Sequence, residues 1–339
     1  MINSQHPAPM PNDYIRTDDT WLAAAARLAR RARPLSRPNP AVGCMIVRQD
    51  RVVGRGWTQV GGRPHAEAVA LAQAGSAAGY ATVYVTLEPC AHENGRGPSC
   101  TELLIKAQVA RVVIGCCDPD PRTAGRGIAA LRTAGMEVEV LHCAASRQSL
   151  AGYLSRVERQ RPFVTLKLAL SIDGCLAMAD RSSRWITGEA ARAHTHGERA
   201  RHDAILIGRG TLLADQPTLD VRLLGLERQS PERWLLTRGQ APAGWQALHD
   251  PADLSVMLPA QYLMVEGGAA TAAAFLRADV VDRLLIYRAP IIIGGGMPGI
   301  GDIGLGSLAA AHGCWRMTDR QALGSDHLEV YGRMSCLPA

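Results

Sequence analysis

The sequence predicts an α/β protein with two domains. Its 339 residues are enough for two hydrophobic cores, and its 47% hydrophobic and 20% charged residues are ordinary for a globular protein. Over residues 20–141, short segments rich in Val and Ile alternate with helix-like segments, which indicates a mixed sheet covered by helices on both faces. A second alternating series begins near residue 163.

The first series opens with a helix predicted over residues 21–33, preceded by capping residues at 17–20 and ended by Pro34. Strands are expected at 44–47 and 51–57, a helix from His65 onward, and a strand at 83–87. A helix at 101–107, a strand at 111–115, a helix at about 127–134 and a strand at 136–141 complete the series. Residues 1–17 are polar and rich in Pro, and we expect them to be disordered.

The second series begins with a strand at 163–170, a helix capped by Thr187 or Gly188 that ends near residue 199, and a strand at 203–208. Residues 210–222 are expected to form a polar loop, and residues 223–260 show no clear pattern. A strand at 262–265 leads to Glu266-Gly267-Gly268 and a helix, where glycines allow either a phosphate contact or a tight turn. We expect domains at 18–148 and 162–335, joined by a linker or helix at 149–161.

The strongest chemical pattern lies between His65 and Cys100. The imidazole of His65 and the thiols of Cys90 and Cys100 suit a zinc ion with three protein ligands, and such a site leaves the fourth position open for catalysis. Glu67 is two residues from His65, and its carboxylate can move the protons of an activated water. This order is typical of zinc deaminases, although nine residues separate the two cysteines here instead of two. A surface histidine with incidental cysteines, the alternative, does not account for the order.

Two further residues are notable for their setting. Asn39 lies between Pro38 and Pro40, so its backbone is stiff and its amide is well placed to bind a ligand; a plain turn is the alternative. Lys167 is one of only two lysines in a chain that otherwise uses Arg, which suggests a specific role for an ammonium group. A lysine at a strand edge is the alternative.

Composition excludes several classes of function. The net charge is +6, but aromatic residues make up only 4% of the chain and provide little for stacking on bases, so no nucleic acid is expected as a partner. The nine cysteines are scattered and no signal peptide is evident, which favours free thiols in a reducing cytoplasm. No apolar stretch approaches the ~20 residues that a membrane span needs.

Several motifs of the first half together resemble the bifunctional deaminase–reductases of riboflavin biosynthesis. They are Pro38-Asn39-Pro40-x-Val42-Gly43, His65-Ala66-Glu67, Thr86-Leu87-Glu88-Pro89-Cys90, and Asp118-Pro119-x-Pro121 with Gly125-Arg126-Gly127. The resemblance implies a cytidine-deaminase fold, one zinc ion on His65, Cys90 and Cys100, and Glu67 as the proton shuttle. Asn39 is assigned to substrate binding. The implied reaction replaces the 2-amino group of a diaminopyrimidinone, which carries a phosphoribosylamino group, by oxygen from water.

The resemblance continues in the second half, on Lys167-Leu168-Ala169-x-Ser171-x-Asp173-Gly174, Trp185-Ile186-Thr187, Thr211-x-Leu213-Ala214-Asp215 and Glu266-Gly267-Gly268. It implies a dihydrofolate-reductase fold and NADPH as cofactor. The implied cofactor contacts are Ala169, Trp185, Thr211, Asp215 and Gly268, and the implied substrate contacts are Ser183, Arg199, Leu219, Arg222 and Glu266. Lys167 or Glu266 would orient the opened sugar or supply a proton. One departure is Leu236-Thr237-Arg238, where the family usually has an Asp-Ser pair.

Two other hypotheses share the zinc motif. A nucleic-acid deaminase, such as a tRNA-editing enzyme with an accessory domain, would need a basic, aromatic-lined groove. A binding protein with a structural zinc would have no use for Glu67. The resemblance also raises a homo-oligomer as an option, and a small molecule as the partner.

Overall fold

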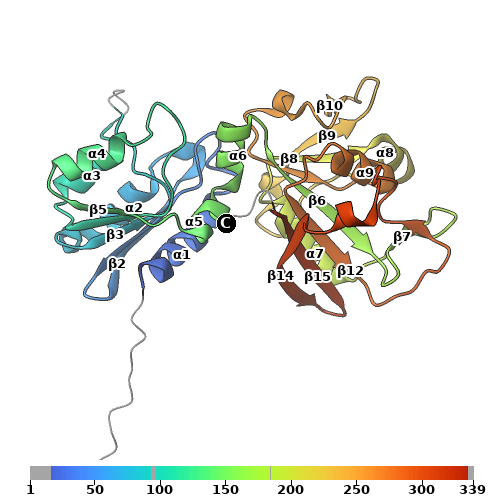
Figure 1. Cartoon of the computed structure of the whole chain (residues 1–339), viewed down its shortest axis with the longest axis horizontal. Helices are drawn as coiled ribbons and strands as arrows, with labels where there is room; N and C mark the ends of the chain where they lie inside the picture. Colours follow the sequence, from blue (N-terminus) through green and yellow to red (C-terminus); the bar gives the residue numbers. More distant parts are fainter. Residues whose placement is uncertain (1–16, 93–96, 184, 335–339) are drawn as a thin grey trace, which may run out of the picture.

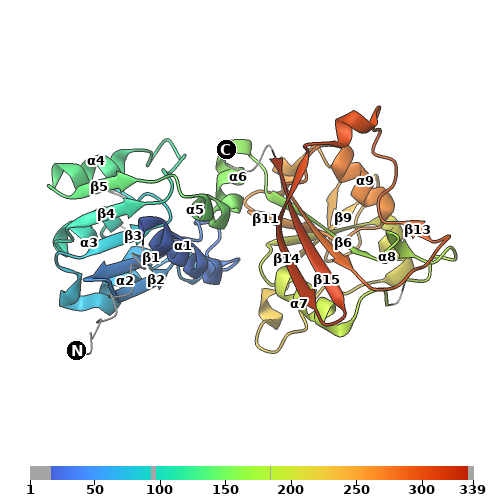
Figure 2. The same cartoon turned by 60° about the horizontal axis from the view of Figure 1, so that its bottom comes forward.

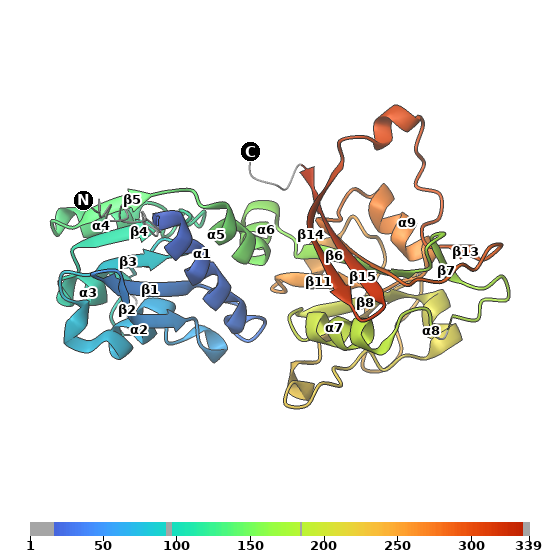
Figure 3. The ribbon, with the colours of Figure 1, turned by 90° about the horizontal axis from the view of Figure 1, so that it is seen from below.

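The computed structural model describes residues 17–92, 97–183 and 185–334, which form two α/β lobes (Figure 1). Helix α6 (Ala151–Arg159) lies between the lobes (Figure 3). The segment expected to be disordered lies outside these residues, apart from Thr17. The predicted domain boundaries remain predictions.

The first lobe contains a five-stranded mixed sheet, as the sequence predicts. Its order is β2 (Arg51–Trp57), β1 (Gly43–Arg48), β3 (Thr82–Val85), β4 (Arg111–Ile114) and β5 (Glu137–Val140). Strand β1 runs antiparallel to both neighbours, whereas β3, β4 and β5 are parallel. The carboxyl ends of β3 and β4 therefore meet at one edge of the sheet.

Helices cover both faces of this sheet (Figure 2). Side chains alternate along β1, so that Cys44 and Ile46 face one core while Met45 and Val47 face the other. The first core includes residues of α2 (Ala66–Ala74), α3 (Cys100–Lys106) and α4 (Arg126–Thr133). The second core includes residues of α1 (Asp18–Ala29) and α5 (Ala144–Ser149).

Helix α1 differs slightly from the prediction. It begins at Asp18 and ends at Ala29, and a 3₁₀ turn continues to Ala32, just before Pro34. The carboxylates of Asp18 and Asp19 in the first turn favour the earlier start, because they interact with the positive end of the helix dipole. Within the described residues, the 3₁₀ helices are Arg30–Ala32, Val60–Gly62, Gly75–Ala78, Glu227–Gln229, Leu254–Met257 and Leu308–Ala311.

The second lobe contains an eight-stranded sheet. Its order is β10 (Gln246–Leu248), β9 (Glu232–Leu236), β8 (Ala204–Gly208), β11 (Tyr262–Val265), β6 (Phe163–Leu170), β12 (Arg283–Arg288), β15 (Asp326–Arg333) and β14 (Trp315–Leu323). The strands from β10 to β12 are parallel, and the β14–β15 hairpin is antiparallel. A small sheet pairs β7 (Cys175–Ala177) with β13 (Met297–Pro298).

Helices α9 (Ala269–Arg277) and α7 (Glu189–Arg199) pack against different sets of strand residues. The even-numbered side chains of β6, from Val164 to Leu170, belong to the core that contains α9. Because side chains alternate along a strand, Lys167 and Ala169 point to the opposite face.

The expectation of a loop over residues 210–222 is wrong in its first part, because α8 spans Arg209–Asp215. Its sequence contains Leu212, Leu213 and Ala214, which favour a helix, and Leu212 packs against the core of the parallel strands. The left-handed backbone of Gln216 (φ 42°) and the following Pro217 end the helix.

The two lobes are in direct contact. The amide of Gln261, at the entrance of β11, donates hydrogen bonds to the carbonyl oxygens of Pro38 (3.0 Å) and Asn39 (3.1 Å). The guanidinium carbon of Arg33 lies 3.5 Å from the ring centroid of Tyr262. The Asn39 segment of the first lobe is therefore fixed by the second lobe.

Two further findings concern membrane spans and cysteines in the described part of the chain. No described helix has both the length and the apolarity required to cross a bilayer. All eight cysteines within the described ranges are free thiols.

We predict that a buried histidine makes the stability of the second lobe pH-dependent. His202 is fully buried between the carbonyl oxygen of Glu198 (2.6 Å) and the hydroxyl of Thr165 (3.2 Å), and its burial lowers its pKa to about 3. The unfolded chain takes up this proton near pH 6.5, whereas the folded chain does not, so stability is lost as the pH falls below about 6.5.

The test is the unfolding temperature between pH 7.5 and pH 5, for the wild type and for His202→Gln. The variant is expected to show a shallower dependence on pH, even where its absolute unfolding temperature is lower. Equal slopes for the two proteins would contradict the assignment.

Candidate active sites

The three predicted zinc ligands meet at the carboxyl edge of the first sheet. His65 is the N-cap of α2, Cys100 is the first residue of α3, and Cys90 lies in the connection after β3. The Nδ1 atom of His65 lies 3.5 Å from Sγ of Cys90 and 3.3 Å from Sγ of Cys100. All three candidate ligand atoms lie within 4.8 Å of one another.

This set fits a zinc ion. Zn–N and Zn–S bonds of about 2.0–2.3 Å place tetrahedral ligands roughly 3.6 Å apart, close to the separations found here. A hydrogen bond from Cys100, opposed by burial and supported by His65, lowers the pKa of Cys90 to about 4, which favours the thiolate that a metal requires. Among the described residues, no other such cluster is present.

Glu67 lies beside the ligand set without belonging to it. Its side chain is in the first turn of α2 and is almost fully buried. Burial, together with the negative charge of Cys90, raises the pKa of Glu67 to about 7. A carboxyl group with such a pKa can both accept and release a proton near neutral pH.

Asn39 is held against the segment that leads into α2. Its side-chain amide donates to the carbonyl oxygen of Gly62 (3.1 Å). Gly62 has φ +86°, and a Cβ atom there would lie 2.3 Å from Nδ2 of Asn39, so only glycine fits. This contact holds Asn39 against the segment that leads to His65, because His65 follows Gly62 by three residues.

Glu88 has a structural role that the sequence did not reveal. Its buried carboxylate accepts hydrogen bonds from four backbone N–H groups, at 3.0–3.3 Å. The donors are Asp118, Gly125, Gly127 and Ile128. Glu88 thus ties the segment that carries Cys90 to the start of α4. The sequence could have indicated this role through an acidic residue before Pro89-Cys90 and a later glycine-rich loop.

His92 is a second residue near the ligand set without an assigned role. Its Nε2 atom lies 3.0 Å from Nη2 of Arg63, and its ring makes an edge contact with the ring of His65. Its position two residues after Cys90 in the sequence could have indicated that His92 lies near the ligand set.

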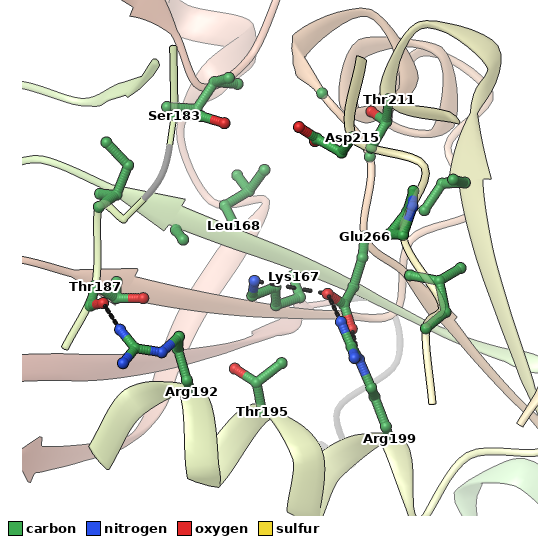
Figure 4. Close-up of a pocket in the computed structure, with 18 of the residues that line it drawn as sticks. Lys167, Leu168, Ser183, Thr187, Arg192, Thr195, Arg199, Thr211, Asp215 and Glu266 are labelled. Carbon is green, nitrogen blue, oxygen red and sulfur yellow. Dashed lines mark hydrogen bonds and ion pairs between the residues drawn. The ribbon is translucent and has the colours of Figure 1, made fainter. Parts of the chain in front are cut away.

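The second site is built around a buried carboxylate in the other lobe. Glu266, just after β11, forms a bidentate ion pair with Arg199 of α7, at 2.7 and 2.9 Å, and lies 3.7 Å from Nζ of Lys167 on β6 (Figure 4). Burial opposes ionisation of Glu266, but the charges of Arg199 and Lys167 outweigh it and lower its pKa to about 2. Burial lowers the pKa of Lys167 from its usual value, against the attraction of Glu266.

All the residues predicted for the reductase half line one cavity of about 530 Å³. They are Lys167, Ala169, Ser183, Trp185, Arg199, Thr211, Asp215, Leu219, Arg222, Glu266 and Gly268. The cavity lies at the carboxyl ends of β8 and β11, where parallel sheets bind ligands.

Three residues of α7 that sequence reasoning did not single out also line this cavity. Arg192, Thr195 and His196 precede Arg199 by seven, four and three residues, so they share its helix face. Arg192 donates to the carbonyl oxygen of Thr187 (Figure 4). The helical spacing was the signal that could have identified them.

Comparison with known proteins identifies the domain that carries each candidate site. Residues 15–116 match the family model described as the cytidine and deoxycytidylate deaminase zinc-binding region, and residues 162–248 and 252–326 match the RibD C-terminal domain. Riboflavin biosynthesis protein RibD of Escherichia coli is 37% identical, over 87% of this chain and 94% of its own. The chain belongs to the RibD family. RibD of Mycobacterium tuberculosis is also 37% identical, over 93% of this chain and 97% of its own.

Solved RibD structures share the whole fold. The structure of RibD from Acinetobacter baumannii has a TM-score of 0.79 at 34% identity and covers 93% of this chain and 98% of its own. A deaminase/reductase from Thermotoga maritima has a TM-score of 0.81 at 27% identity, with the same coverage. The two expected folds, cytidine-deaminase-like and dihydrofolate-reductase-like, are therefore confirmed.

Membership of the RibD family establishes the general function. The chain is a bifunctional enzyme of riboflavin biosynthesis that acts on a small molecule, with a zinc-binding deaminase domain and a reductase domain of the kind that uses NADPH. A tRNA deaminase with an accessory domain is not favoured, because the second half matches the RibD reductase domain.

The contact between the lobes gives a prediction about deamination. In Gln261→Glu, the two donated hydrogen bonds to the Pro38 and Asn39 carbonyls are lost at unchanged size. If Asn39 contacts the pyrimidine, KM for deamination should rise about fivefold, as expected for a loss of ~1 kcal/mol, with kcat unchanged. The measurement is steady-state ammonia release.

The matched control is Arg37→Gln, which removes the ion pairs with Glu232 (2.9 Å) and Asp203 (3.8 Å) but leaves the side-chain amide of Gln261 unchanged. It should keep the wild-type KM. A Gln261→Glu enzyme with wild-type KM would contradict a positioning role for this contact.

Proposed function

We propose that the first lobe deaminates 2,5-diamino-6-(5-phosphoribosylamino)pyrimidin-4-one and that the second lobe reduces the ribosyl group of the product to ribityl with NADPH. The observation that carries this proposal is the buried Glu67 beside the His65, Cys90 and Cys100 set, since a purely structural zinc site needs no such carboxyl group. The solved T. maritima relative is named as a deaminase and reductase of these phosphoribosylamino compounds.

In the deaminase site, the chain supplies ligands and a proton carrier. A bound zinc ion would lower the pKa of a water molecule at the open fourth position. Glu67 would take a proton from such a water molecule as the oxygen adds to C2 of the pyrimidinone. It then gives the proton to the departing amino group, which leaves as ammonia. The pKa of Glu67, about 7, suits both directions of transfer.

In the reductase site, the geometry supports different roles for two residues, Lys167 and Glu266, that the sequence left open. NADPH would supply a hydride to C1′ of the opened sugar. Glu266 has a pKa of about 2, so it is ionised and has no proton to give. We therefore assign the proton to Lys167, whose Nζ lies 3.7 Å from Glu266, and assign to Glu266 the orientation of the sugar hydroxyls.

Arg199 and Arg222 are also assigned different roles. Three N–H groups of Arg199 are already used, two by Glu266 and one by the carbonyl oxygen of Asp220. Arg222 is largely exposed, and only a weaker contact of 3.7 Å joins it to Asp220. Arg222 is therefore the better group for the ribose phosphate, with Arg199 mainly holding Glu266.

We further propose one zinc ion per chain, supported by the single candidate cluster among the described residues. A cytoplasmic location is proposed from the free thiols, and a homo-oligomer from the resemblance alone. A low aromatic content supports the absence of a nucleic-acid partner.

Replacing Glu67 by Gln should separate metal binding from catalysis. The variant keeps the size of the side chain and all three metal ligands, so zinc content should stay at the wild-type level. Deamination should fall by about 10²–10⁴-fold, because proton transfer is lost. Reduction of the deaminated intermediate should persist. Loss of zinc from the variant would overturn the assigned role.

Replacing Lys167 by Met should impair reduction and leave deamination intact. Reduction should fall by about 10²–10⁴-fold through kcat, while NADPH binding and ammonia release persist. Lys106→Met is the matched control, because Lys106 is the other lysine of the chain and is exposed on α3. Wild-type reduction by Lys167→Met would exclude Lys167 as the proton donor.

A further inference from the structure

A second cavity, of about 620 Å³, lies between the two lobes. Helices α5 and α6 form one wall, and residues at one edge of the eight-stranded sheet form the other (Figure 3). Phe163, Tyr262 and Arg283, which belong to this second wall, are the first residues of the parallel strands β6, β11 and β12. The reductase cavity lies at the carboxyl ends of the parallel strands, so the two cavities occupy opposite edges of one sheet.

The lining of this inter-lobe cavity has an excess of positive charge. Two carboxylates, Asp282 and Glu158, face five arginines, which are Arg33, Arg147, Arg159, Arg283 and Arg316. Both carboxylates are already paired. Asp282 accepts hydrogen bonds from Arg159 (2.7 Å) and Arg161 (2.7 and 2.9 Å). Glu158 lies 3.7 Å from Arg147. The remaining positive charge favours an anion as the occupant of the cavity.

Two of the arginines have donor groups available for such an anion. The guanidinium of Arg33 stacks on the ring of Tyr262, and its Nη2 donates to the carbonyl oxygen of Arg201 (3.3 Å). The Nε atom of Arg33 is buried and has no hydrogen-bond partner among the described residues. Arg316 on β14 is exposed, and within the described ranges its guanidinium has no hydrogen-bond or ion-pair partner. A buried N–H without a partner is costly, and an acceptor in the cavity would satisfy it.

Much of the remaining wall is apolar. Its apolar members come from α5 and α6 and from the sheet, and they are Ala144, Ala145, Ala151, Leu154, Phe163 and Met317. Small-molecule sites usually have volumes of roughly 300–1,000 Å³ and combine apolar walls with a few polar groups, and the inter-lobe cavity has both properties. It therefore suits a molecule that has an anionic group and an apolar body.

We propose that the inter-lobe cavity binds a small phosphate ester with an apolar or aromatic body, through Arg33 and Arg316. A phosphate monoester carries nearly two negative charges near neutral pH, and guanidinium groups bind it by charge-assisted hydrogen bonds. Arg33 belongs to the first lobe and Arg316 to the second, so a ligand held by both stabilises the contact between the lobes. This contact includes Gln261, the neighbour of Tyr262, which holds the Asn39 segment.

The test uses phenyl phosphate as the probe, with phenol and inorganic phosphate for comparison. All measurements use the zinc-loaded full chain with Arg222→Gln, because Arg222 is the group proposed to bind a phosphate in the reductase cavity. Isothermal titration calorimetry should show one site per chain for phenyl phosphate and weaker binding of phenol and inorganic phosphate. The probe should also raise the unfolding temperature, because it binds the folded state.

Adding Arg316→Gln should weaken binding of phenyl phosphate at least tenfold, as expected for the loss of a hydrogen bond between charged groups. The rise in unfolding temperature should be reduced in parallel. Arg33→Lys, which keeps the charge but loses the planar guanidinium, should weaken binding as well.

Arg320→Gln is the matched control, since Arg320 is an exposed arginine of the same strand and is not part of the cavity lining. It should leave binding of the probe unchanged. Absence of binding before Arg316 is replaced would overturn the inference, and so would equal binding with and without Arg316→Gln. Equal losses from Arg316→Gln and Arg320→Gln would also overturn it, because they would indicate a general effect of surface charge.

Discussion

The buried carboxylate of Glu88 fixes the frame in which the candidate zinc ligands meet. It accepts four backbone N–H groups from residues 118–128, and its neighbours in sequence are Pro89 and Cys90. Loss of this carboxylate would leave several buried N–H groups without partners, each at a cost of about 1–3 kcal/mol. The packing is also tight, because a Cβ atom on Gly127 would lie 2.0 Å from the carbonyl oxygen of Pro89. The position of the Cys90 sulfur therefore depends on α4 as well as on β3.

The two active sites share one structural strand. Strand β11 begins after Gln261, which holds the Asn39 segment of the first lobe, and ends before Glu266, which orders the second site. Its four residues are all fully or nearly fully buried. A short, buried strand thus connects the Asn39 segment of the first lobe with Glu266, the central carboxylate of the second site. The two reactions take place on one chain whose halves are in direct contact through Gln261, and each site has its own chemistry.

Much of this arrangement could be predicted from local patterns, and the rest could not, for identifiable reasons. His65, Cys90 and Cys100 were predictable because metal-binding side chains are rare in such an order. Helix α8 was missed because its polar residues indicated a loop, whereas contacts of Leu212 with distant strands stabilise the helix. The roles of Glu88 and Gln261 depend on partners 30 to 223 residues away, which no local pattern reveals. The cavity that brings Arg33 and Arg316 together between the lobes is likewise a long-range property.

The central claim is that one chain carries out hydrolysis at the first site before hydride transfer at the second. The most direct measurement follows ammonia release and NADPH oxidation together, on the zinc-loaded enzyme supplied with the diaminopyrimidinone phosphoribosylamine. The account predicts that ammonia is released without NADPH, and that NADPH oxidation begins only after ammonia has formed. Oxidation of NADPH without ammonia release would contradict this order, and the absence of both signals with zinc bound would contradict the account as a whole.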